Sequence, residues 1–251
     1  MAWDIDISEE AGVRYLHFGS EWVQGAMRIA RPWSLELEYT REMMASLLMR
    51  DHANWPRRIL QIGLGAGSLT RFLYRHYPDA RLTVVEIDPR VVYVARQHFR
   101  VPNDDERLHT VIGDGAEFVM KKGPGFDLIL VDGFDQFARP GTLDTLPFLL
   151  NARQRLAKDG IFVVNLLSRQ KGFRTSVERL KETFDNRCQV FPRDSAGNAI
   201  GFATTGRPVT LDIATLHTQA TRLKKVTGLK LEDTIKRLCS NASKDGLVIN
   251  F

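Results

Sequence analysis

The chain has 251 residues, of which 43% are hydrophobic and 26% charged, as is usual for a globular protein. No apolar run approaches the ~20 residues that a membrane-spanning helix requires, and the acidic start MAWDIDISEE lacks the apolar segment of a secretory signal. Cys188 and Cys239 lie far apart, without a CxxC or metal-ligand pattern. We therefore expect a reduced, cytoplasmic protein that holds no metal.

A small N-terminal β region is predicted over residues 1–36. Residues 13–29 are rich in β-forming side chains and contain a Gly19-Ser20 turn, which is typical of a hairpin. After residue 37 the spacing of apolar residues changes to that of a helix, and this spacing persists to Leu48.

Strands alternate with helices in the predicted central domain, residues 37–206. We expect strands near 59–62, 82–86, 108–112, 127–131, 161–166, 187–191 and 199–204. We expect helices near 68–77, 89–100, 114–121, 144–157 and 171–184. Because the last two strands are joined by a short loop at 194–198, they read as a hairpin. The pattern predicts an α/β fold with a seven-stranded, mostly parallel, doubly wound sheet of the S-adenosylmethionine-dependent methyltransferase type.

The segment 59–89 carries the most informative motif. An apolar run ends in the turn Gly63-Leu64-Gly65-Ala66-Gly67, an amphipathic helix follows, and a second apolar run ends in Glu86. Glycines let a ligand approach the backbone, and a carboxylate can accept both hydroxyl protons of a ribose. Ser68 stands where a dinucleotide fingerprint has its last Gly or Ala. The motif therefore favours a nucleoside without a pyrophosphate, such as an S-adenosyl sulfonium compound.

Acidic residues recur where later strands are predicted to end. Gly113-Asp114-Gly115 follows the third strand, and Asp132 and Asp135 follow the fourth, FDLILV. Ligands of open α/β sheets bind outside the carboxyl ends of the strands, so these residues predict a nucleoside cleft. Asp114 suits a helix N-cap and could also accept a bond from an adenine amino group. Asp132 is a candidate general base, with a structural cap as the alternative.

A basic helical extension is predicted over residues 207–251, with helix from about 211 to 240. The extension holds eight Lys and Arg residues against four acids. Because no aromatic residues are interleaved with these charges, they indicate a solvated helix face rather than contact with nucleic acid.

Taken together, the motifs resemble those of the spermidine synthase family of aminopropyltransferases. The resemblance covers about residues 15–206 and rests on the segments Gly19 to Gln24, Glu42-Met43, Ile62 to Gly67, Val85 to Asp88, Gly113 to Gly115, and Val131-Asp132 with Asp135. It implies transfer of an aminopropyl group from decarboxylated S-adenosylmethionine to the amine of a polyamine. It also implies a homodimer or a higher homo-oligomer.

The resemblance further implies a role for each matching residue. Asp132 would deprotonate the attacking amine, and Asp135 would attract the charge of the amine substrate. The substrate side would also include Tyr39, Arg41 and Glu42. The nucleoside of the donor would be bound by Gln24, Gly63, Gly65, Gly67, Glu86, Ile87, Asp114 and Gly115.

Two positions depart from the pattern of that family. Ala66 replaces an Asp in the glycine turn, and Thr40-Arg41 replaces a Tyr followed by Gln or His, although Tyr39 lies one residue earlier. An Arg that faced the cleft would bind a carboxylate. These residues therefore keep open a methyltransferase, or another transferase, that uses intact S-adenosylmethionine.

A third interpretation is a nucleoside-binding protein without turnover. Asp132 and Asp135 argue against it, because a scaffold has no need for two acids at the rim of the sheet.

Overall fold

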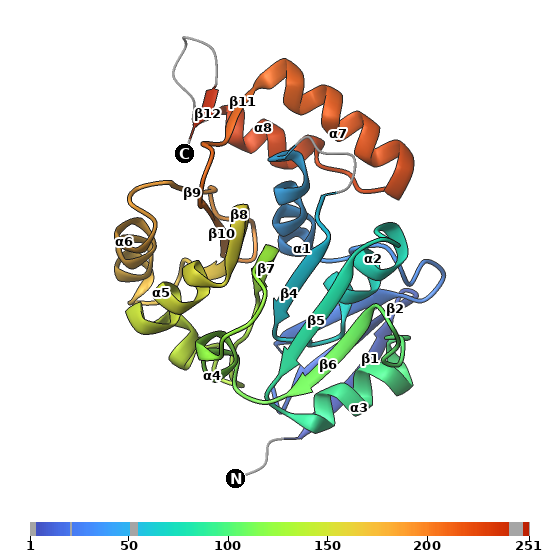
Figure 1. The fold of residues 1–251 in the computed structure, drawn as a ribbon. Coiled ribbons are helices and arrows are strands. Elements are labelled where there is room, and N and C mark those ends of the chain that lie inside the picture. The colour runs from blue at the N-terminus through green and yellow to red at the C-terminus, as the bar shows by residue number, and fades with distance from the viewer. Residues whose placement is uncertain (1–3, 21, 51–54, 241–247, 251) are drawn as a thin grey trace.

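A seven-stranded sheet forms the centre of the molecule (Figure 1). The structure is a computed structural model that describes residues 4–20, 22–50, 55–240 and 248–250. The strands are β4 (Arg58–Ile62), β5 (Arg81–Glu86), β6 (Leu108–Ile112), β7 (Phe126–Val131), β8 (Leu156–Leu167), β9 (Cys188–Val190) and β10 (Asn198–Thr204). Their order is β6-β5-β4-β7-β8-β10-β9, and β10 runs antiparallel to both of its neighbours. The predicted fold class is confirmed.

Helices cover both faces of this sheet, which explains why its inner strands are almost continuously apolar. One face holds α1 (Glu38–Met43), the 3-10 helix η1 (Met44–Leu48), α2 (Ser68–His76) and α3 (Pro89–His98). The other face holds α4 (Gly115–Met120), α5 (Leu146–Gln154) and α6 (Phe173–Thr183). Adjacent strand residues such as Ile59 and Leu60 belong to opposite clusters. Asp88 caps α3, and Asp114 caps α4 as predicted.

The predicted helix over 144–157 ends too late. In the structure α5 stops at Gln154, and β8 begins at Leu156, which pairs with Phe126. The next pair is Leu128 with Ile161, so residues 157–160 bulge out of the strand. Residues 158–160, which precede the predicted strand at 161–166, therefore lie inside β8.

The N-terminal region is a three-stranded antiparallel sheet of β1 (Ile5–Glu10), β2 (Val13–Phe18) and β3 (Val23–Arg28). It has one strand more than the predicted hairpin. The sequence did not predict β1, because most residues of this strand are polar and exposed. Leu16 of β2 and Met27 of β3 are fully buried and join the cluster that covers one face of the central sheet. This packing brings the β2–β3 loop to the carboxyl ends of the central strands.

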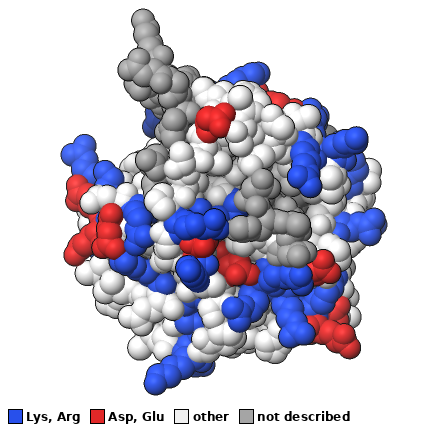
Figure 2. All heavy atoms as spheres, turned by 45° about the horizontal axis from the view of Figure 1, so that its top comes forward, with Lys and Arg blue, Asp and Glu red and all other residues white. Residues whose placement is uncertain are grey.

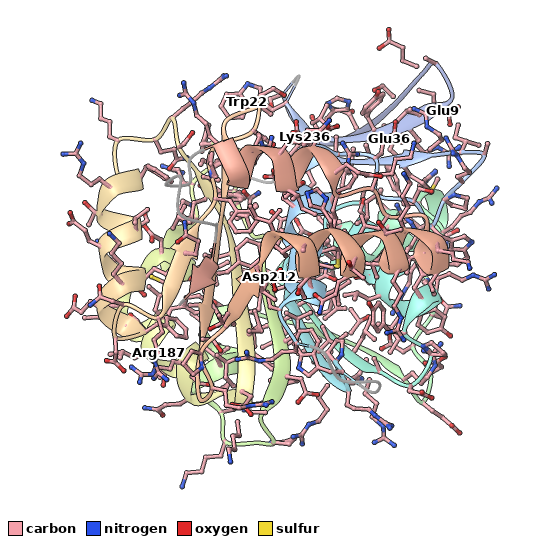
Figure 3. All side chains as sticks on the ribbon, turned by 90° about the horizontal axis from the view of Figure 1, so that it is seen from above. Glu9, Trp22, Glu36, Arg187, Asp212 and Lys236 are labelled. Carbon is pink, nitrogen blue, oxygen red and sulfur yellow. The ribbon has the colours of Figure 1, made fainter. Side chains whose placement is uncertain are left out.

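The C-terminal extension contains two helices, α7 (Ile213–Thr227) and α8 (Glu232–Ser240), instead of one long helix. They are separated at Gly228, which has a φ of 75° and caps α7. Two short strands, β11 (Thr210–Asp212) and β12 (Val248–Asn250), pair beside them. The two helices lie side by side across one end of the molecule (Figure 3). The side chain of Cys239 and the residues Lys244 and Asp245 lie outside the described residues.

The exposed charges of this end of the molecule are mixed in sign. Lys and Arg side chains spread over the face shown in Figure 2, and Asp and Glu side chains lie among them. Lys224 forms an ion pair with Glu232, and Lys236 with Asp233. The apolar residues Leu216 and Ile235 point inward and are buried in the core. The two helices are therefore packed elements of the domain whose charged sides face solvent.

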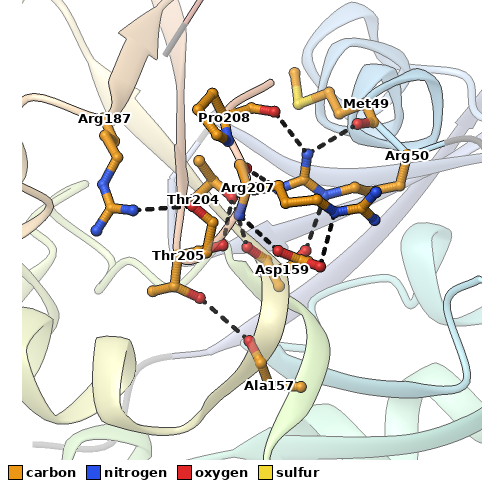
Figure 4. A network of polar contacts seen from close by, with 11 residues as sticks. Met49, Arg50, Ala157, Asp159, Arg187, Thr204, Thr205, Arg207 and Pro208 are labelled. Atoms are coloured by element: carbon orange, nitrogen blue, oxygen red, sulfur yellow. Dashed lines mark hydrogen bonds and ion pairs between the residues drawn. The ribbon is translucent and has the colours of Figure 1, made fainter. Parts of the chain in front are cut away.

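A polar network fastens the start of this extension to the central domain (Figure 4). Arg50 donates to the backbone oxygen of Asp159 at 2.9 Å and to Thr204 Oγ1 at 2.6 Å. Arg207 donates its backbone N–H and its Nε to the two carboxylate oxygens of Asp159, at 2.6 and 3.0 Å. Among the described residues, no helix combines the length and apolarity needed to cross a membrane.

Candidate functional site

A cavity of about 600 Å³ lies at the carboxyl ends of the central strands, beside the N-terminal β2–β3 loop. Several loops that sequence analysis singled out converge there, because parallel strands end at one edge of their sheet. Ten of the predicted site residues line the cavity: Gln24, Tyr39, Gly63, Gly65, Glu86, Ile87, Asp114, Gly115, Asp132 and Asp135. Glu21, within the matched Gly19–Gln24 segment, lies outside the described residues.

The glycine turn is pressed against the end of β7. Gly63 has a φ of 89°, and a Cβ atom there would lie 2.1 Å from the backbone oxygen of Asp132. Only glycine fits, because the backbone is left-handed and the approach is closer than any side chain allows. This contact places the turn and Asp132 on neighbouring walls of one cavity.

Glu86 holds the glycine turn in place. Its Oε2 accepts a bond from the backbone N–H of Leu64 at 2.8 Å, and its Oε1 accepts one from Asp88 at 3.0 Å. Burial raises the pKa of Glu86, although the backbone donors oppose that effect. Each oxygen retains lone pairs, so Glu86 can still accept hydroxyl protons from a ligand.

Asp114 and Gly67 have structural contacts that bear on their predicted roles. Asp114 accepts a bond from the N–H of Ala116 at 2.6 Å through Oδ1 and so caps α4. Asp114 also lines the cavity. Gly67 is not among the lining residues. With a φ of 71°, it caps α2, and a Cβ atom there would lie 2.1 Å from Cγ2 of Val101. Gly67 therefore serves the packing behind the turn.

Asp132 is held from two sides. The Tyr39 hydroxyl donates to Oδ2 at 3.0 Å, and the Asn165 amide donates to Oδ1 at 3.0 Å. Burial raises the pKa of Asp132, while the bonds from Asn165 and Tyr39 oppose the increase. Burial and the neighbouring Asp132 carboxylate raise the pKa of Tyr39 well above its usual value, so Tyr39 is a neutral donor. The result is an oriented carboxylate in the cavity wall.

Asp135 lies on the next loop, and its charge is offset. Arg139 donates its Nε to Asp135 Oδ2 at 2.8 Å, and the backbone N–H groups of Phe137 and Arg139 donate to Oδ1. Burial alone would raise the pKa of Asp135, but the bonds from Arg139 and Phe137 outweigh it and lower the pKa. Arg139 also lines the cavity. Asp135 is therefore a paired carboxylate rather than a free negative charge.

The structure does not bring Arg41 and Glu42 to the cavity. Arg41 donates to the backbone oxygens of Leu35 and Glu36, at 3.0 and 2.6 Å. Glu42 is fully buried and forms an ion pair with Arg237 of α8. Successive residues of a helix project in different directions, so α1 presents Tyr39 to the cavity and turns Glu42 away. The expectation that Arg41 binds a carboxylated donor loses its structural basis.

Sequence analysis missed other residues that line the cavity, among them Gln61, Asn165 and Arg139. Gln61 donates to the backbone oxygen of Gly63 at 2.8 Å and accepts a bond from Thr70 at 2.8 Å. A signal was present in two cases, because Gln61 and Asn165 are polar residues inside otherwise apolar strands.

Among the described residues, no three His, Cys, Asp or Glu side chains are grouped as metal ligands.

Comparison with known proteins identifies the family. The spermine/spermidine synthase domain matches residues 37–192. The chain belongs to this family. A polyamine aminopropyltransferase of Neisseria meningitidis is 37% identical over 97% of this chain and 92% of the relative. Another, from Chromobacterium violaceum, is 37% identical over 94% of this chain and 89% of the relative. The predicted resemblance to the spermidine synthase family is confirmed.

Solved structures agree with the spermidine synthase fold. A probable spermidine synthase from Corynebacterium glutamicum has a TM-score of 0.73, covering 98% of this chain and 94% of its own, at 22% identity. Human methyltransferase-like protein 13, in complex with SAH, has a TM-score of 0.67 at 26% identity, over 76% of this chain and 93% of its own. The fold is thus shared by this spermidine synthase family member and by methyltransferases.

Proposed function

We propose that this chain is a polyamine aminopropyltransferase that uses decarboxylated S-adenosylmethionine as donor. The observation that carries the proposal is the Asp132 carboxylate, held by Tyr39 and Asn165 in a cavity that Glu86 and Asp114 also line. Near-full-length relatives named polyamine aminopropyltransferase support the same activity. A nucleoside cleft with a base in its wall is what such a transfer requires.

The donor nucleoside is assigned to the glycine-turn side of the cavity. Glu86 and Gln24 would accept or donate bonds at the ribose hydroxyls, and Asp114 would accept one from the adenine amino group. Ile87 is 67% exposed at this wall and offers an apolar surface to the adenine ring. Gly63 and Gly65 leave room for the ligand beside the backbone.

The transfer itself is a displacement at carbon. The lone pair of the acceptor nitrogen forms a bond to the carbon next to the positively charged sulfur, and the carbon–sulfur bond breaks. Its electron pair stays on sulfur, which leaves as the neutral thioether of methylthioadenosine. The nitrogen must be neutral to attack, yet an alkylamine is protonated near pH 7, since its pKa resembles that of Lys at ~10.4. Asp132 is assigned the removal of that proton.

The acidic cavity also favours a cationic acceptor. Glu86, Asp114 and Asp132 line the cavity, although the whole chain carries a net charge of +5. A local field inside a cleft outweighs the net charge of the protein for a ligand that binds there. Because Arg139 offsets Asp135, the attraction is assigned mainly to Asp132 and its acidic neighbours.

A methyltransferase that uses the intact donor is the second candidate. Ala66 stands where the family carries an acid for the amino group of the decarboxylated donor. A methyltransferase homolog from Drosophila melanogaster is 31% identical over 59% of this chain, although this region is only 22% of that relative. The near-full-length relatives favour aminopropyl transfer over this alternative.

Isothermal calorimetry separates the two candidates. The purified chain would be titrated with decarboxylated S-adenosylmethionine, with S-adenosylmethionine and with methylthioadenosine. We expect tighter binding of the decarboxylated donor. When butane-1,4-diamine is added together with this donor, we expect mass spectrometry to show that the diamine has gained the mass of one aminopropyl group. Clear preference for the intact donor, without aminopropylated product, would reject the proposal in favour of the second candidate. Binding of none of the three would favour a protein without this activity.

A further inference from the structure

Arg237 of the C-terminal helix α8 lies behind the helix that carries Tyr39. Arg237 of α8 contacts Glu38 and Glu42, which lie four residues apart on α1. Residues at this spacing share one face of a helix, so one guanidinium bridges a full turn of α1. Glu42 is fully buried, and its carboxylate contacts the guanidinium of Arg237. The ion pair with Arg237 is therefore the compensation for a buried charge.

Two walls of the cavity depend on the residues that Arg237 contacts. Tyr39 follows Glu38 directly, lines the cavity and donates to Asp132. Glu38 also accepts a bond from the Ser195 hydroxyl at 3.3 Å, on the loop before β10, and Ala196 of this loop lines the cavity. Arg237 thus lies behind both the helix that carries Tyr39 and the loop before β10.

The helix α1 needs such support from outside. It has six residues and no side-chain N-cap bond, whereas helices shorter than about 12 residues are marginal on their own. Helix α8 can provide the support, because Leu231 and Ile235 are buried in the core. Arg237 therefore contacts residues of α1 that are more than 190 positions earlier in the sequence, next to Tyr39.

We propose that Arg237 is a positioning residue for the reaction: by holding Glu38 and Glu42, it fixes the helix from which Tyr39 orients Asp132. This inference rests on the proposed role of Asp132 as base. Loss of Arg237 would leave Glu42 buried without its partner and would release α1. Asp132 would then lose one of the two donors, Asn165 and Tyr39, that oppose the effect of burial on its pKa.

Several groups face this hydrogen bond and enter its pH dependence. Tyr39 approaches Asp132 from α1, and Asn165 approaches it from β8. Asp194, at the start of the loop before β10, acts on Tyr39 as a further negative charge. Asp135 and Arg139 lie on the loop after β7 and are paired with each other. Of these groups, Tyr39 is the one that Arg237 controls.

The test is a double-mutant cycle between Arg237→Met and Tyr39→Phe, read as kcat against pH. We expect each single variant to lower kcat about tenfold and to move the acidic limb of the profile to higher pH. The double variant should lose less than about twofold beyond Tyr39→Phe, because both changes remove one interaction. Lys236→Met, one residue earlier on α8 and 76% exposed in its side chain, is the matched control (Figure 3). It should leave kcat and the profile unchanged.

A second variant and an NMR titration complete the test. If Arg237→Met does not fold, the double variant Arg237→Met with Glu42→Gln replaces it in the cycle, because this variant removes both charges of the ion pair. Carbon-13 NMR titration of the Asp132 carboxyl in the ligand-free protein requires no turnover. Its midpoint should move upward in the Arg237 and Tyr39 variants alike. Additive losses of kcat, or an unchanged Asp132 midpoint in the Arg237 variant, would overturn the inference. If Tyr39→Phe itself leaves kcat unchanged, the proposed role of Asp132 and Tyr39 fails instead.

Discussion

The carboxyl group of Asp132 is subject to opposing influences. Burial raises its pKa, and the donors Asn165 and Tyr39 oppose that increase. A base whose pKa lies above the usual Asp range is better matched to removing a proton near neutral pH. The two donors also fix the direction in which its free lone pairs point. The same contacts therefore set both the pKa and the orientation of the Asp132 carboxylate.

Replacement of Asp132 tests its role. We expect Asp132→Asn to lower kcat by roughly 10²- to 10⁴-fold while methylthioadenosine binds with unchanged affinity, because only the proton acceptor is removed. Steady-state kinetics and calorimetry measure the two quantities. Turnover at the original rate would show that another group accepts the proton.

The same substitution has a defined effect on stability. Because the pKa of Asp132 is raised, the folded protein holds a proton there more tightly than the unfolded chain does. Stability therefore falls as pH rises through the interval between the unfolded and folded pKa values. Asp132→Asn removes this loss, so its Tm at pH 7 should equal or exceed that of the original protein. A lower Tm at pH 7 would contradict this account.

The donors to Asp132 can be tested separately from the base. Asn165→Ala removes a bond that lowers the pKa of Asp132, so the acidic limb of kcat/KM should move upward by about one pH unit. Asn151→Ala, on α5, where the Asn151 amide donates to the backbone oxygen of Pro147, is a control of the same residue type. An Asn165 variant with an unshifted limb would mean that this bond does not govern the protonation of Asp132.

Single residues were also where sequence reasoning reached its limit. Asp114 and Asp132 could be placed at the cavity because strand ends meet at one edge. Arg41 and Arg139 could not, since the direction of a long side chain depends on tertiary neighbours. Asn165 stands out as a polar residue within an apolar strand, but the sequence gives no sign that it contacts Asp132.

At the scale of elements, the glycine turn is the most constrained piece of backbone in the site. Gly63→Ala places a methyl group against the backbone of β7 at a left-handed position. Gly12→Ala has a similar φ of 76° and no atom within 4 Å of the added Cβ, so it measures the conformational cost alone, about 1 kcal/mol. We expect Gly63→Ala to cost clearly more in urea unfolding and to weaken methylthioadenosine binding at least about tenfold. Equal effects of the two variants would mean that the contact with the backbone of Asp132 adds nothing to the free-energy cost of Gly63→Ala.

Periodicity predicted most elements of the central sheet, because buried strands and amphipathic helices have distinct spacings. It failed where local signals conflict with tertiary pairing. β1 is largely polar, so only its pairing with β2 makes it a strand. Leu156 lies at the end of a helical pattern but pairs with Phe126, so β8 begins before the turn at Asp159.

At the scale of the molecule, the network around Asp159 joins the C-terminal extension to the central domain. Its bonds from the backbone and side chain of Arg207 lower the pKa of Asp159, against the effect of burial. A lowered pKa contributes stability above the unfolded value, and that stability is lost as pH falls through the folded value. The network is therefore expected to weaken in acid.

Asp159→Asn tests this junction while keeping a residue that tolerates the φ of 62° found there. We expect a loss of about 1–2 kcal/mol in unfolding free energy at pH 7, which corresponds to a fall in Tm of several degrees. The difference from the original protein should shrink as pH is lowered below the Asp159 pKa. Asp233→Asn, whose side chain is 91% exposed, should change Tm by little. A pH-independent difference would show that charge is not the cause.

Family and fold together exclude more of the reactions that this chain could catalyse than either does alone. The same sheet occurs in a spermidine synthase and in a methyltransferase, so the fold leaves the transferred group open. The sequence motifs resembled those of the spermidine synthase family, and that resemblance implied aminopropyl transfer. Ala66 lines the cavity and is one of the two positions at which this chain differs from that pattern, and we expect it to affect donor binding.

The contact between Arg237 and Glu38 spans 199 positions of the chain. During synthesis, the glycine turn, the strand ends and Asp132 all leave the ribosome well before α8 does. A chain extends at about 5–20 residues per second, so the central domain has seconds in which to fold before Arg237 emerges. The contact behind Tyr39 can therefore form only after the other elements of the site have been synthesised.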